Sequence, residues 1–173
     1  NNYIEGAFLG KGKYYRVCNG DDPEPKEVLV NIFKYIGKAD IIIPWQDQKE
    51  VVGKSLFRKC LSRVFTRLVN LISGYNIKYY NGNAIHLRFN VMIWHPSSYC
   101  FGFQADITTR LLYEGASYIH IKSRSIDRKG SDSSALTVRN ILSVIHTLWE
   151  LTIRRVRKFL YGKNMAKPTE LKT

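Results

Sequence analysis

The sequence is poor in cysteine and contains no long apolar run, and these shortages exclude some kinds of protein. Its three cysteines, Cys18, Cys60 and Cys100, are widely spaced and form no C-x-x-C motif. Such a set argues against a disulfide framework and predicts buried, reduced thiols in a domain on the cytosolic side. No apolar run approaches the roughly 20 residues that span a bilayer, and no signal-peptide pattern opens the chain. Membrane contact by this segment is therefore expected to be peripheral.

Acidic residues are also scarce. The chain has 14 Asp and Glu against 27 Lys and Arg, which gives a net charge of +13. This balance favours an anionic partner, such as a nucleotide, a nucleic acid, a phospholipid or a phosphorylated acceptor, without choosing among them. With 173 residues, 45% of them hydrophobic, the chain is expected to form a single globular domain. It begins with Asn directly before an expected strand, so we expect it to be a segment of a longer protein.

Segments with apolar residues at helical spacing alternate along the chain with shorter, strand-like apolar runs. This alternation predicts an α/β domain. Apolar residues at helical spacing, ended by glycines, predict helices over residues 24–36, 54–73 and 101–114. Shorter runs predict strands over residues 13–18, 39–44, 77–87 and 118–124, the third around an Asn81-Gly82-Asn83 turn or bulge. Strands that alternate with helices indicate a mostly parallel sheet flanked by helices.

The last predicted element, residues 138–161, is a long helix without Gly or Pro. Its apolar stripe includes Trp149 and Phe159, and Glu150 is its only acid beside five basic residues: Arg139, Arg154, Arg155, Arg157 and Lys158. A basic amphipathic helix of this kind can lie in an anionic membrane interface, where each basic group contributes about 1 kcal/mol. It can equally pack on the sheet with its basic end solvated. A polar tail, residues 163–173, follows.

The segment KYYRVCNGDDPEPKE, residues 13–27, stops abruptly at two adjacent carboxylates, Asp21 and Asp22. Acids at a strand end can hold Mg²⁺ or Mn²⁺ together with the phosphates of a substrate, because both ions prefer hard oxygen ligands. The alternative is an acidic turn in which Asp22 caps the next helix and Pro23 takes its first position.

The order of these pieces resembles glycosyltransferase family 2. The similarity runs over residues 4–161 through GKGKYYRVCNGDDPEP, KADIIIPW, LFRKCLSRVFTRLVNLISGYNIKYYNG, FGFQADITTRLLYEGASYIHI and RKGSDSSALTVRNILSV. The similarity is to the branch of this family that has the GT-A fold and includes dolichol-phosphate-mannose-synthase-like enzymes. The resemblance implies a partial GT-A-like fold over residues 1–137, followed by the amphipathic helix within residues 138–162. It also implies sugar transfer from a nucleotide sugar, with Mg²⁺ or Mn²⁺ as cofactor.

The resemblance assigns a metal site to the first acidic segment. Asn19-Gly20-Asp21 falls where the family has Asp-x-Asp, so the first acid is replaced by an amide. Asp21 is then expected to be the main metal ligand, with Asp22 or the oxygen of Asn19 completing the shell. The family's nucleotide-binding first strand is expected to precede residue 1.

Gln104 and Asp106, in FGFQAD, match the family motif Phe-x-Phe-Gln-x-Glu at the start of a helix that faces the donor sugar. The resemblance implies that both are catalytic residues and that Asp106 takes the proton of an acceptor hydroxyl. An ionised lipid phosphate as acceptor needs no base, and Asp106 would then orient groups or hold metal. The alternative is a structural acid that stabilises the helix dipole, with Gln104 satisfying the backbone.

The resemblance also implies phosphate-binding residues. Arg128, Lys129, Ser131 and Ser134 lie where the family often has Arg-x-x-Gly-x-Ser-Lys, with Ser134 in the place of the lysine. A flexible polar loop is the alternative. Arg88 matches a basic position that could meet an acceptor phosphate, or it is a surface arginine. The four histidines have no metal-ligand spacing, which indicates packing or surface roles: His86, His95, His120 and His146.

These patterns lead to an expected function as a metal-dependent glycosyltransferase. It would act peripherally on the cytosolic face of the membrane, with an anionic or lipid-linked acceptor such as a polyprenyl phosphate. Asn19, Ser134 and the missing donor strand also fit a catalytically impaired binding or scaffold module. A nucleic-acid partner is not expected, because no RNP, OB or helix-turn-helix signature accompanies the charge.

Overall fold

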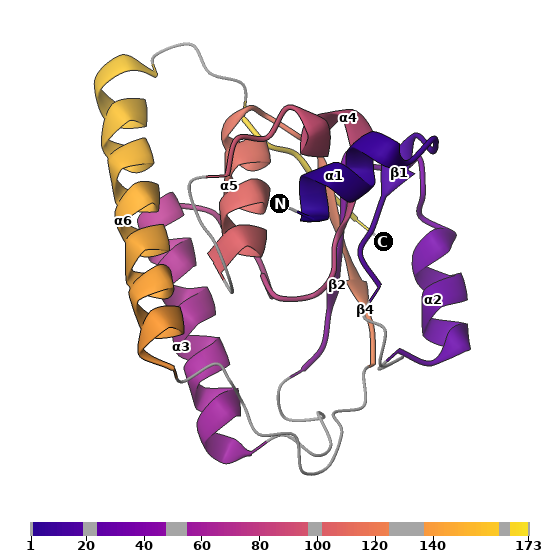
Figure 1. Ribbon diagram of the computed structural model, residues 1–173, viewed down its shortest axis with the longest axis horizontal. Coiled ribbons are helices and arrows are strands. Elements are labelled where there is room, and N and C mark those ends of the chain that lie inside the picture. Colours follow the sequence, from indigo (N-terminus) through magenta and orange to yellow (C-terminus); the bar gives the residue numbers. More distant parts are fainter. Residues whose placement is uncertain are drawn as a thin grey trace.

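A five-stranded mixed sheet, in the order β1-β3-β2-β4-β5, forms the centre of the computed structural model. The structure describes residues 2–18, 24–47, 55–96, 102–124, 137–162 and 167–172. The strands are β1 (Tyr14–Tyr15), β2 (Ile41–Trp45), β3 (Ile85–Leu87), β4 (Tyr118–Lys122) and β5 (Glu170–Leu171). The helices in these ranges are α1 (Asn2–Leu9), α2 (Lys26–Phe33), α3 (Leu56–Ser73), α4 (Arg88–Met92), α5 (Phe103–Tyr113) and α6 (Val138–Tyr161) (Figure 1).

The direction of the strands corrects the predicted sheet. β2 pairs with β4 in parallel from Ile41 opposite Tyr118 to Trp45 opposite Lys122, and β4 pairs with β5 in parallel. β3 is antiparallel to both of its neighbours, β1 and β2. The α/β class is confirmed, but the sheet is mixed rather than mostly parallel, because β3 runs against the other described strands.

The predicted strand over residues 77–87 is wrong for most of its length, since only Ile85–Leu87 joins the sheet. The side chain of Asn70 on α3 takes the place of a strand partner at Ile77. Its Oδ1 accepts from the Ile77 N–H at 3.1 Å and its Nδ2 donates to the Ile77 carbonyl at 2.9 Å. The backbone N–H of Lys78 donates to Nε2 of His120 at 3.2 Å. Tertiary hydrogen bonds therefore hold this segment outside the ladder.

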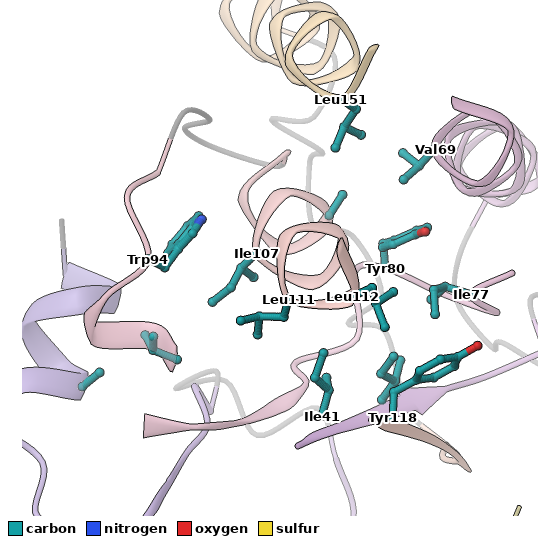
Figure 2. Packing of buried hydrophobic residues seen from close by; sticks show 14 residues of the cluster. Ile41, Val69, Ile77, Tyr80, Trp94, Ile107, Leu111, Leu112, Tyr118 and Leu151 are labelled. Atoms are coloured by element: carbon teal, nitrogen blue, oxygen red, sulfur yellow. The ribbon is translucent and has the colours of Figure 1, made fainter. Parts of the chain in front are cut away.

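Helices cover both faces of the sheet. Ile41 and Ile43 of β2 point toward α5, whereas Ile42 points to the opposite face, where Ile32 of α2 covers it. α5 is the central helix of the larger core. Figure 2 shows its residues Ile107, Leu111 and Leu112 between the sheet and the inward residues of α3 and α6, Val69 and Leu151. α3 and α6 therefore form an outer layer beyond α5.

The first and last described segments form elements that were not predicted, α1 and β5. The first residues form α1 rather than leading straight into a strand, and Tyr3 packs edge-on against Tyr15 and Trp94, with ring centroids 5.3 and 6.0 Å apart. In the tail, Glu170 begins β5 and its Oε1 lies 2.9 Å from Nδ1 of His120. Both elements are stabilised by contacts with residues far away in sequence, which local patterns do not contain.

The predicted burial of the cysteines is wrong for two of them. Cys18 and Cys60 are free and exposed, and Cys100 lies outside the described residues. Cys60 is exposed because the side of α3 that carries it, together with Leu56 and Leu61, faces away from the core.

Candidate functional site

The start of α5 meets the Asn81-Gly82-Asn83 segment, and this contact is the centre of the candidate site. Nε2 of Gln104 donates to Oδ1 of Asn83 at 3.0 Å. Gly102, the residue before α5, lies so close to Thr147 of α6 that a Cβ there would overlap the threonine side chain. The close approach requires glycine, and it fixes the start of α5 against α6.

An ion pair brings a third segment to the same place. Nη2 of Arg16 lies 2.6 Å from Oε2 of Glu24, and Nε of Arg16 donates to the Asn83 carbonyl at 2.9 Å. Arg16 and Glu24 flank the segment predicted to hold the metal, so both sides of that segment are anchored beside Asn83. Its proposed ligands, Asn19, Asp21 and Asp22, lie outside the described residues.

A small hollow with both polar and apolar lining residues lies between these elements. It measures about 10 Å³, room for about one water molecule, and its lining includes Tyr3, Asn83, His86, Gln104 and Thr108. His86 is buried, and its Nδ1 has no hydrogen-bond partner in the described part of the chain. Burial lowers the pKa of His86 to about 4, so the ring is neutral at pH 7. An unpaired buried nitrogen of this kind calls for a water molecule or a ligand group beside it.

Asp106, the predicted base, is fully buried in an ion pair with α6. Its Oδ1 lies 2.5 Å from Nη2 of Arg154, and Nε1 of Trp94 donates to its Oδ2 at 3.3 Å. Arg154 also donates to Oγ1 of Thr109 at 3.3 Å. Both carboxylate oxygens of Asp106 are therefore engaged within the core, which favours a structural role that joins α5 to α6.

Arg88, the predicted acceptor-phosphate residue, donates to backbone carbonyls in the structure. Its Nε donates to the Gly12 carbonyl at 2.7 Å and its Nη1 to the Ala7 carbonyl at 3.2 Å. These bonds tie α4 to the end of α1 and the residues after it. The guanidinium therefore has a structural role in this arrangement.

The other predicted phosphate-binding residues, Arg128, Lys129, Ser131 and Ser134, lie outside the described residues. Within the described ranges, no three His, Cys, Asp or Glu side chains form a group that could hold a metal ion. His86 and His120 are buried, and His95 and His146 are exposed.

A scan of the sequence against protein-family models gave no match, and a search of curated proteins found no similar protein. The glycosyltransferase interpretation accordingly depends on the ordered motifs and on the geometry around Asn83.

Sequence reasoning missed several residues of this site: Tyr3, Arg16, Glu24 and His86. For Arg16 and Glu24 the spacing gives no local signal, because they are 8 residues apart and meet only after folding. Gly82 did carry a signal, since a glycine inside a strand-like run indicates close approach of another backbone. A Cβ at Gly82 would overlap the carbonyl oxygen of Pro44.

Proposed function

We propose that this chain carries the sugar-transfer site of a metal-dependent, nucleotide-sugar-dependent glycosyltransferase similar to family 2, with a partial GT-A-like fold. The main support is the contact between Gln104 and Asn83 beside the Arg16–Glu24 pair. It brings Arg16 and Glu24, which flank the acidic segment, to Asn83 and the start of α5. The resemblance assigns the acidic segment to the metal and the start of α5 to the donor sugar.

The position of the site in the sheet supports the same proposal. In open α/β sheets, ligands bind outside the carboxyl ends of parallel strands, where helix N-termini offer backbone N–H groups to phosphates. β2 and β4 are parallel, and Gly82, next to Asn83, lies against the Pro44 carbonyl near the carboxyl end of β2. A nucleoside diphosphate at this edge would lie next to Gln104.

The proposed metal ligands are Asp21, Asp22 and the oxygen of Asn19, with Mg²⁺ or Mn²⁺ as the ion. The metal would supply positive charge to the diphosphate leaving group. The chain's own contribution, in this proposal, is to orient the donor through Gln104 and Asn83.

The burial of Asp106 favours one class of acceptor. An acceptor hydroxyl needs a base, and Asp106 is occupied by Arg154 and Trp94. An acceptor phosphate is already ionised and needs none. We therefore favour an anionic acceptor, such as a polyprenyl phosphate or another lipid-linked phosphate.

A second candidate is a catalytically impaired binding or scaffold module. The observation that favours it is Asn19, which replaces the first acid of Asp-x-Asp. A neutral amide is a weaker ligand for Mg²⁺ than a carboxylate, so nucleotide could bind without turnover.

Transfer and hydrolysis of a panel of nucleotide sugars, measured with Mn²⁺ present, test the proposal. Gln104→Ala is expected to lower kcat/KM roughly tenfold, because it removes one hydrogen-bonding group at the donor. Asn76→Ala changes an exposed amide elsewhere and is expected to leave the rate unchanged. Calorimetric binding of nucleoside diphosphate without any turnover would favour the binding module. Absence of both binding and turnover would contradict the proposed site.

A further inference from the structure

α6 is oriented with its apolar side outward. Its inward positions include Asn140, Thr147 and Arg154, and Leu151 is its only buried large apolar residue. Its exposed apolar residues are Val138, Ile141, Leu142, Ile145, Trp149, Val156, Phe159 and Leu160. An amphipathic helix packed on a core normally shows the opposite arrangement.

The inward cations of α6 explain why this orientation is stable. Arg154 pairs with Asp106, Arg155 donates to the Ser73 carbonyl at the end of α3 at 3.3 Å, and Lys158 donates to the Tyr75 hydroxyl at 3.3 Å. Lys158 also lies over the rings of Tyr75 and Tyr113. These three basic residues anchor the helix to the domain, although Arg155 remains exposed, so they are less available to lipid than the simplest interpretation of the sequence implies.

α3 also exposes most of its apolar residues. Its inward side is a narrow strip in which Val69 and Ser73 are buried, Phe65 and Ile72 pack against the core, and Asn70 holds the Ile77 backbone. Its exposed apolar residues are Leu56, Phe57, Leu61, Val64, Leu68 and Leu71. α3 and α6 contact each other and form the outer layer of the domain (Figure 1). Their exposed apolar residues together are called the outer helix face below.

The charges beside the outer helix face are almost all positive. Arg63 and Arg67 of α3 and Arg139 and Arg157 of α6 are exposed. α3 contains no acid, and the only acid of α6, Glu150, lies 3.9 Å from His146. Basic side chains that surround a broad apolar surface with Trp and Phe match the interface of an anionic bilayer.

We propose that the outer helix face binds the surface of an anionic lipid bilayer, with α3 and α6 lying in the interface. No helix in the described ranges is long and apolar enough to cross a membrane, which fits binding in the plane. A second copy of the chain is a poorer occupant, because it would place exposed arginines against exposed arginines in a buried contact. Exposed apolar residues on adjacent helices and the surrounding charge thus point to lipid.

Co-sedimentation with vesicles of phosphatidylcholine and phosphatidylglycerol in equal parts tests this proposal. The test variant is Leu71→Glu/Trp149→Glu. The matched control is Leu9→Glu/Phe89→Glu, on α1 and α4. Leu71 and Leu9 are each 80% exposed, and Trp149 and Phe89 are 64% and 65% exposed, so both variants add the same charge at equally exposed apolar sites.

We expect the test variant to bind vesicles roughly a hundredfold more weakly than the wild type, since two inserted side chains are lost. The control is expected to bind within about threefold of the wild type, because its new charges lie off the docking face. Wild-type binding is expected to weaken as salt rises and on pure phosphatidylcholine.

Equal loss in both variants would overturn the proposal, because it would show an effect of net charge alone. A wild-type chain that ignores vesicles, yet forms a dimer that Leu71→Glu/Trp149→Glu separates, would assign the face to a second copy. Circular dichroism checks that each variant is folded. No nucleotide sugar is present in this assay, so its outcome is independent of the proposed transfer activity.

Discussion

Arg154→Met is expected to lower the free energy of unfolding by about 3–5 kcal/mol, the range found when one partner of a buried ion pair is removed. The substitution leaves the fully buried carboxylate of Asp106 without its counter-charge and keeps a side chain of similar length. Trp94 then remains as a hydrogen-bond donor to that carboxylate, which does not replace a positive charge. Urea unfolding followed by circular dichroism measures the loss.

Two further variants make this expectation specific. Arg157→Met changes an exposed arginine of the same helix and is expected to alter stability by less than about 0.5 kcal/mol. The double variant Arg154→Met/Asp106→Leu is expected to recover much of the loss, because no unpaired charge stays buried. If Asp106→Asn keeps full stability yet loses sugar transfer, the structural role of Asp106 is wrong and the catalytic assignment stands.

Stability is also expected to fall as the pH drops from about 6.5 to about 4, and His86 is expected to contribute about 3 kcal/mol of this fall. Burial lowers the pKa of His86 from 6.5 to about 4 in the folded chain. Between these values the unfolded chain binds a proton that the folded chain does not, so acid favours unfolding. The contribution of His86 to stability is thus complete above pH 6.5 and is lost below it.

Urea unfolding at a series of pH values, with His86→Phe as the variant, checks this expectation. The variant is expected to show a shallower loss of stability between pH 6.5 and 4. Some slope is expected to remain, because burial also lowers the pKa of His120. A full slope in His86→Phe would assign the acid sensitivity to other groups.

The sequence predicted best those elements whose ends are set by local chemistry. α6 occupies residues 138–161 as predicted, because the Thr137 side chain caps its first turn and Gly162 follows its end. α3 begins after the capping Ser55 and ends at Gly74, where a left-handed conformation with φ 76° suits glycine. β2 is a buried apolar run, and β4 is a buried strand built around Ile119 and Ile121.

The remaining parts depend on partners far away in sequence. The segment after Gly74 reads as a strand, but the side chain of Asn70 binds its backbone first. The periodicity of α6 showed one apolar and one basic side without showing which of them faces the core. That choice depends on Asp106, Ser73 and Tyr75, which accept the cations. In the candidate site, Gln104 was predicted, whereas Arg16, Glu24 and His86 reach it only through the fold.

The contact between Gly102 and Thr147 fixes how far the start of α5 lies from α6. Thr147 belongs to α6, which we propose lies on lipid, and Gly102 is two residues before Gln104. Because the Thr147 side chain lies directly against the Gly102 backbone, the start of α5 cannot shift relative to α6 without breaking this contact. On a membrane, Gln104 would therefore be held at one height above the lipid headgroups. The proposed transferase would then select acceptors by the depth of their reactive phosphate as well as by their chemistry.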